Sequence, residues 1–148
     1  MENNTVIACG EKDFYVYQCG ATVSEKHSQV FSGEAKSIFV TEDRIGVITK
    51  NPEVAKEGKT VDKYKVQVYR HSGTKAGSFT LDFDYKSVAA SDKDIIFYND
   101  QECEIYSHRG HKKFQHTFDH TIESVLPGNN AGEYILLDQQ NVQTITLK

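Results

Sequence analysis

The chain has 148 residues, of which 38% are hydrophobic and 26% are charged, a composition typical of a globular domain with a real core. Its formal net charge of −4 argues against nucleic-acid binding, which depends on clustered Lys and Arg side chains. Its longest apolar runs, such as 95–98 and 134–137, are far shorter than the roughly 20 residues of a membrane-spanning helix. Residues 1–9 do not resemble a signal peptide.

Short apolar segments rich in β-branched and aromatic residues alternate with polar turns along the chain, which predicts strands and not helices. After three strands within residues 4–33, we expect strands at 37–40, 45–49, 64–70, 78–83, 86–90, 95–98, 102–107, 113–118, 123–126, 134–137 and 142–147.

These strands form a repeating unit. Val68-Tyr69 and Ile105-Tyr106 each precede a turn that ends in glycine, Gly73 or Gly110, and Val16-Tyr17 occupies the same place before Gly20. A repeat of roughly 40 residues with four short strands is typical of a β-propeller blade. We therefore predict an all-β fold, a partial propeller of about four blades in one domain, with units at 4–33, 36–84, 86–119 and 122–148.

We name the strands of a blade A to D, from the inside of a propeller outward. The first unit is expected to hold strands B, C and D, and the last to hold A, B and C. Apolar runs such as 14–17 and 95–98 lack a polar face, so we expect neighbouring blades to cover both faces of every sheet. The alternative, a β-sandwich, leaves one face of each strand in solvent.

Several segments also carry a family resemblance: 95–100, 102–106, 112–114 and 144–148. They resemble the carboxy-terminal part of an uncharacterised bacterial family of propeller-like proteins with WD40-type or quinoprotein-type repeats. The resemblance implies a membrane-tethered protein with an amino-terminal anchor and an extracytoplasmic propeller about twice as long as this chain. The chain departs from that family in lacking the anchor and the first half of the propeller, so a cytoplasmic location stays open.

The three cysteines are Cys9, Cys19 and Cys103. If residues 10–13 form a hairpin turn, Cys9 faces Phe14 and Cys19 faces Asn4, so the two sulfurs lie on the order of 16 Å apart. This distance excludes a disulfide. We expect all three cysteines to be small apolar strand residues.

Residues 51–63 form an insertion between strands B and C of the second unit. In a propeller, B–C turns share a face with the D–A connections, beside the mouth of the central channel, and long loops on rigid scaffolds often carry function. The candidate partner-binding residues are its polar side chains: Asn51, Glu53, Lys56, Glu57, Lys59 and Lys63.

Metal binding is not expected. His108, His111, His116 and His120 fall on different edges of one blade, and His71 lies at the corner equivalent to His108, so we expect turn histidines that face solvent. The acidic corners at 11–13, 42–43 and 92–94 lack the alternating oxygen ligands and glycine of a calcium loop. We expect their carboxylates to bond to turn backbone.

No catalytic motif or phosphate-binding glycine cluster is present, so we predict a non-enzymatic interaction or scaffold module without a cofactor. Its partner would be a protein or a component of the cell envelope. The open ends of a blade arc favour self-association, as a homodimer, or docking of the missing propeller half. The alternative is a small-molecule or glycan binder that uses the channel mouth, although Ile38, Val40, Val88 and Ala90 on the inner strands are apolar or small.

Overall fold

The computed structural model describes residues 4–50 and 63–147, and every regular element in these ranges is a β-strand. In chain order they are β1 (Thr5–Cys9), β2 (Asp13–Cys19), β3 (Val23–Val30), β4 (Ala35–Val40), β5 (Arg44–Lys50), β6 (Tyr64–Arg70), β7 (Lys75–Leu81), β8 (Ser87–Ala90), β9 (Asp94–Tyr98), β10 (Glu102–Ser107), β11 (Lys112–Thr117), β12 (Ile122–Pro127), β13 (Glu133–Asp138) and β14 (Val142–Thr146). Among these residues no helix is long and apolar enough to cross a membrane.

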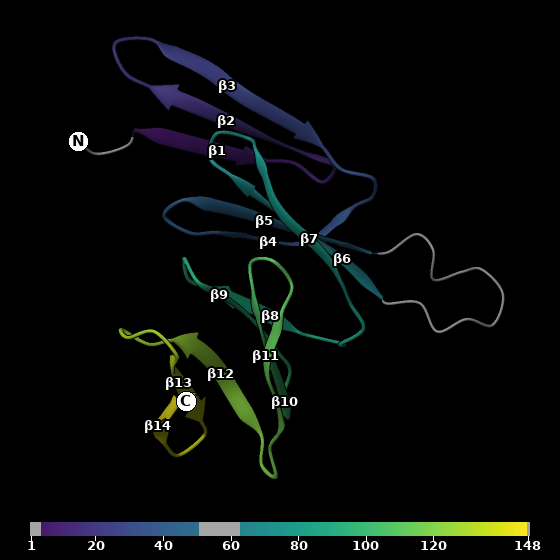
Figure 1. Cartoon of the computed structure of the whole chain (residues 1–148), viewed down its shortest axis with the longest axis vertical. Coiled ribbons are helices and arrows are strands. Elements are labelled where there is room, and N and C mark those ends of the chain that lie inside the picture. The colour runs from purple at the N-terminus through teal and green to yellow at the C-terminus, as the bar shows by residue number, and fades with distance from the viewer. Residues whose placement is uncertain (1–3, 51–62, 148) are drawn as a thin grey trace, which may run out of the picture.

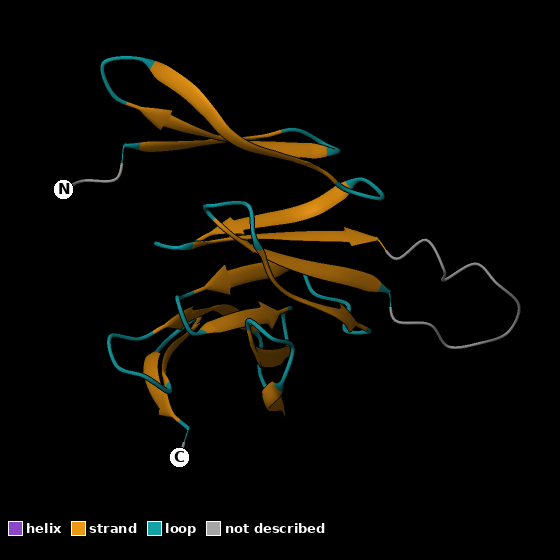
Figure 2. Cartoon of the chain, turned by 45° about the horizontal axis from the view of Figure 1, so that its top comes forward, coloured by secondary structure: helices purple, strands orange, loops and turns teal. Residues whose placement is uncertain are grey.

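The strands form four antiparallel sheets of consecutive strands: sheet 1 (β1–β3), sheet 2 (β4–β7), sheet 3 (β8–β11) and sheet 4 (β12–β14). Figure 1 shows the sheets following one another from the N-terminal sheet at the top to the C-terminal sheet at the bottom, and Figure 2 shows only strands and loops. The inner strands β4, β8 and β12 lie next to one another along the arc. This is the predicted all-β architecture of partial propeller blades.

The core is divided into three clusters, one at each interface between successive sheets. Phe14, Ile45 and Tyr69 lie between sheets 1 and 2. Phe39, Val66 and Phe97 belong to the cluster between sheets 2 and 3, with Phe83 packed against it. The cluster between sheets 3 and 4 contains Cys103, Val125 and Leu136, and Phe118 packs against it. The aromatic rings of Phe39, Phe83, Phe97 and Phe118 thus lie between blades.

The strands of the two central sheets are buried in runs. β5 and β9 have almost every residue buried, because each sheet has a neighbour on both faces. The prediction of two covered faces is wrong for 14–17. Phe14 and Val16 are buried, but Tyr15 and Tyr17 point to the open side of sheet 1 and are only partly buried. The same alternation occurs in β13, in the last sheet.

The cysteine prediction is confirmed: Cys9 pairs with Phe14 across the first hairpin, the backbone N–H of Cys19 donates to the carbonyl of Asn4, and all three thiols are free. Burial raises the pKa of the Cys103 thiol to about 12.

Candidate functional site

The D–A connections and the B–C turns lie on one face of the arc, which we call the turn face. The backbone N–H of Phe118, in the connection between sheets 3 and 4, donates to the carbonyl of Gln101 at 2.7 Å. Ile122 donates to Asp100 at 2.8 Å, and Phe31 donates to Lys12 at 2.8 Å in the first sheet. The expected placement of B–C turns beside D–A connections is therefore correct.

A polar groove runs along the turn face over sheets 3 and 4. It consists of two hollows, of about 490 Å³ and about 380 Å³, which share Thr121. Nearly all the lining side chains are charged, amide or hydroxyl groups: Asp84, Lys86, Asn99, Asp100, Gln101, His120, Thr121, Asp138, Gln139, Gln140, Asn141 and Gln143. We name this surface the polar groove.

Two equivalent side chains hold the B–C turns that form its walls. The Oδ1 atom of Asn99 accepts from the backbone N–H groups of Gln101 (2.9 Å) and Glu102 (2.8 Å). Asp138, the matching residue of sheet 4, accepts from Gln140 (2.8 Å) and Asn141 (2.7 Å) in the same way. This side-chain capping is typical of Asn and Asp in tight turns, and it fixes the groove on rigid elements.

The groove carries ionised carboxylates. Hydrogen bonds from backbone N–H groups hold the pKa of Asp138 below its usual range. The His120 ring, 2.7 Å from Asp119 and 3.6 Å from Asp138, lowers the pKa of Asp119 through a side-chain hydrogen bond. Lys86 forms an exposed ion pair with Asp100.

Of the predicted partner-binding residues, only Lys63 can be placed; Asn51, Glu53, Lys56, Glu57 and Lys59 lie outside the described residues. Lys63 pairs with Asp84 at 3.1 Å, and the Tyr64 hydroxyl also donates to Asp84 at 3.1 Å. These contacts hold the pKa of Asp84 below its usual range, with Lys63 the larger cause. Since Asp84 lines the polar groove, Lys63 lies at its edge.

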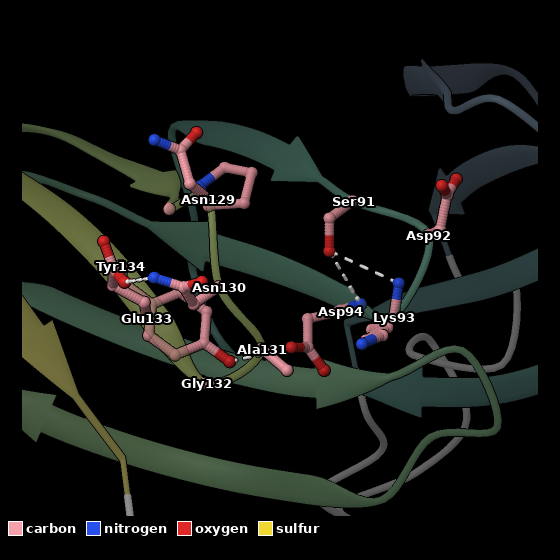
Figure 3. Close-up of a pocket in the computed structure, with 12 residues that line it drawn as sticks. Ser91, Asp92, Lys93, Asp94, Asn129, Asn130, Ala131, Gly132, Glu133 and Tyr134 are labelled. Carbon is pink, nitrogen blue, oxygen red and sulfur yellow. Dashed lines mark hydrogen bonds between the residues drawn. The ribbon is translucent and has the colours of Figure 1, made fainter.

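The opposite face carries a smaller hollow of about 170 Å³ between the A–B turns of sheets 3 and 4 (Figure 3). Asp94, at its base, is buried. It accepts a hydrogen bond of 2.8 Å from the Tyr134 hydroxyl, and Lys113 forms an ion pair with its other oxygen. Burial, followed by the bond to Asp94, raises the pKa of Tyr134. Because all its polar atoms have partners, this cluster joins two sheets and offers no free group to a ligand.

The predictions for Asp94, in the acidic corner at 92–94, and for His108 are wrong, whereas His111, His116 and His120 are exposed as expected and His71 is half-buried. The carboxylate of Asp94 binds side chains, while the hydroxyl of Ser91 accepts from the turn backbone at Asp94 (3.2 Å). His108 is buried rather than facing solvent, because its ring donates to the carbonyl of Ser91 at 2.8 Å. No group of three or more His, Cys, Asp or Glu side chains that could hold a metal occurs in residues 4–50 and 63–147.

Sequence reasoning found the insertion but missed the polar groove itself. The available signal was a polar residue directly after each strand B of the last two units, Asn99 and Asp138, in the position that caps a turn. The two hollows share Thr121 because sheet 4 packs against sheet 3. This packing is a long-range feature that no local sequence pattern predicts.

Solved structures similar to this chain are β-propeller proteins. Kluyveromyces lactis Hsv2 matches over 99% of this chain and 43% of its own, at 14% identity and a TM-score of 0.59. BBS1N, in complex with ARL6DN, matches over 100% and 54% at 13% identity (TM-score 0.54), and the N-terminal domain of Nup159 over 92% and 37% at 10% (TM-score 0.53). These likenesses establish the fold, and this chain spans about half the length of such neighbours.

No curated protein matches the chain. The match that covers it is to a family model: residues 1–147 correspond to the model described as "Family of unknown function (DUF5711)". The chain therefore belongs to the DUF5711 family.

Proposed function

We propose that the chain is a non-enzymatic interaction module that binds a protein partner through the polar groove. The observation that carries this proposal is the groove itself: an open polar surface on turns that are fixed by side-chain caps. The capped turns form a pre-organised contact surface, because their backbone is already fixed before a partner binds.

The electrostatics favour binding over proton transfer. Three carboxylates of this region, Asp84, Asp119 and Asp138, have pKa values below the usual range and stay ionised at neutral pH. A general acid or base works best with a pKa near the operating pH. Fixed negative charges instead favour a partner surface that presents Lys or Arg side chains between polar groups.

The alternative of a small-molecule site at the channel mouth has less support. Ile38, Val88 and Ala90 of the inner strands pack against the clusters between sheets. The hollows of the polar groove are wide and polar, whereas small-molecule sites are mostly enclosed and apolar.

One comparison supports a protein partner. BBS1N, a propeller neighbour, is in a complex with another protein, ARL6DN. The resemblance of the sequence to a membrane-tethered bacterial family adds a setting to the proposal, in which the module lies outside the cytoplasm and its partner is a protein of the cell envelope.

The test is photo-crosslinking in the cells that make the protein, with a photoreactive amino acid at Gln140 in the groove or at Asn129 on the opposite face. We expect a discrete protein adduct from position 140 and none from position 129. Asp138→Asn should reduce that adduct, because it removes the charge and keeps the turn cap that Asn99 provides in sheet 3.

Equal adducts from both positions, or an adduct unaffected by Asp138→Asn, would contradict the proposed site. Mass spectrometry of the adduct separates a different protein from a second copy of this chain.

A further inference from the structure

The outer face of sheet 1 carries apolar and aromatic side chains that the described residues cover only in part. Val6 pairs with Tyr17 across β1 and β2, and Ala8 pairs with Tyr15. The two tyrosine rings stack at a centroid distance of 6.3 Å, and Val6 is 51% exposed. Val23, next to this face on β3, is also exposed.

The strand register shows which side chains of later sheets occupy the same positions. Sheets 1, 2 and 3 each have a register shift between strands C and D immediately before a tyrosine: Tyr17, Tyr69 and Tyr106. The residues paired with these tyrosines on strand B are Val6, Ile45 and Ile95. Tyr17 and Val6 thus correspond to residues that sheets 2 and 3 bury.

The buried equivalents pack against the preceding sheet. The Tyr69 ring contacts Phe14 of sheet 1 at 5.3 Å, and the Tyr106 ring stacks on Phe79 of sheet 2 at 5.2 Å. The outer face of sheet 1 therefore has the composition and register of a face that receives a preceding blade. We call it the receiving face.

The outer face of sheet 4 corresponds instead to the faces of earlier sheets that pack against the following sheet. Its apolar residues are Leu126, Ile135, Leu137 and Val142, and the pairing of Leu137 with Val142 matches that of Ile48 with Val66 in sheet 2. Ile48 and Val66 are fully buried against the following sheet, whereas Val142 is 71% exposed. We call this surface the covering face, because in sheets 1 to 3 its equivalents cover the receiving face of the next sheet.

We propose that two copies of this chain bind head to tail, with the covering face of one copy on the receiving face of the other. Each interface inside the arc is a contact between these two kinds of face, and one chain presents one of each at its ends. A head-to-tail contact closes into a ring where the rotation allows it. The described arc matches 43% of the Hsv2 propeller chain, so two such arcs fit within one ring of that size, and the proposed assembly is a closed dimer.

The experiment is sedimentation velocity over a dilution series, with variants that place a charge on one face at a time. Val6→Glu acts on the receiving face, Val142→Glu acts on the covering face, and Val40→Glu is the control, since Val40 is 52% exposed and lies outside both faces. We expect wild type and Val40→Glu to dimerise. Each end variant alone should raise the dissociation constant by at least about tenfold.

Mixing the two end variants gives the decisive outcome. A Val6→Glu chain keeps its covering face and a Val142→Glu chain keeps its receiving face, so the mixture should form a dimer that neither variant forms alone. A wild type that stays monomeric at all concentrations overturns the proposal. So does a dimer that only one end variant weakens, because that pattern indicates two identical faces in contact.

Discussion

The same strand positions are buried at the interfaces inside the arc and exposed at the faces at its ends. Ile45 and Ile95 are completely buried between sheets, while the equivalent Val6 at the N-terminal end is half-exposed. Tyr69 and Tyr106 pack on rings of the preceding sheet, and among the described residues the ring that Tyr17 stacks on is that of Tyr15, in its own sheet. Burial in this chain is therefore set by the place of a sheet in the series rather than by the sheet's own residues.

The largest expected difference in the free energy of unfolding is between variants of the equivalent tyrosines Tyr106 and Tyr17. Tyr106→Ala should lower the free energy of unfolding by about 3–5 kcal/mol, because it leaves a cavity at the interface of sheets 2 and 3. It also removes the hydroxyl that donates to the buried Glu104 at 2.6 Å. Tyr17→Ala should cost less than about 1 kcal/mol at concentrations where the chain is monomeric. Urea unfolding measures both, and equal losses would show that sheet 1 is covered in the monomer.

A smaller loss of stability is expected when the hydrogen bond between Asp94 of sheet 3 and Tyr134 of sheet 4 is removed. Asp94→Ala should cost about 2–3 kcal/mol, because the buried Tyr134 hydroxyl loses its acceptor and Lys113 loses its partner. The exposed neighbour Asp92 is the matched control, and Asp92→Ala should change the free energy of unfolding by less than about 0.5 kcal/mol. An equal effect of both variants would mean that these contacts do not stabilise the interface.

The glycines of the C–D turns, Gly110 near the end of its turn and Gly20 at the start of the turn in sheet 1, sharpen the comparison further. Gly110 has a φ of 89°, and a Cβ atom there would lie 2.5 Å from Phe79 of the preceding sheet. Gly20, in the matching turn of sheet 1, would place a Cβ atom no nearer than 3.9 Å to another residue. Gly110→Ala should therefore cost about 1–3 kcal/mol, and Gly20→Ala should be neutral or slightly stabilising. Thermal unfolding of both variants checks this, and a destabilising Gly20→Ala would show that the turn at the open end is constrained as well.

The repeat made the fold predictable. An aliphatic residue and a tyrosine before a turn that ends in glycine recur at Tyr69 and Tyr106, and the structure shows a register shift at each, because the pattern reflects one backbone arrangement built twice. The open faces could not be predicted from the same signal. Residues 14–17 are as apolar as 95–98, and only the number of neighbouring sheets separates them.

The site was less predictable than the fold. The insertion stands out by length, but of its candidate residues only Lys63 lies among those described. The polar groove depends on Asp138 and His120, which meet because β12 follows β11 through a short connection and returns beside sheet 3. The sequence wrongly predicts that His108 faces solvent. Its turn position gives no sign that the carbonyl of Ser91, in another turn, accepts a hydrogen bond from its ring.

The last prediction concerns pH and the burial of sheet 3 against sheet 4. The pKa of the Cys103 thiol rises from 9.0 to about 12 through burial, so above about pH 9 the unfolded chain loses this proton while the folded chain keeps it. The free energy of unfolding should then fall between about pH 9 and 12, by up to about 1.4 kcal/mol per pH unit for this single group.

Cys103→Val should change stability at pH 8 by less than about 1.5 kcal/mol, because valine occupies the equivalent position 66 in sheet 2. The variant should also flatten the decline above pH 9, where Tyr85 and Tyr134, whose pKa values burial also raises, become the main remaining contributions. Denaturant unfolding at pH 8, 9, 10 and 11 separates the two proteins, and parallel declines would show that Cys103 is not shielded by the covering of sheet 4.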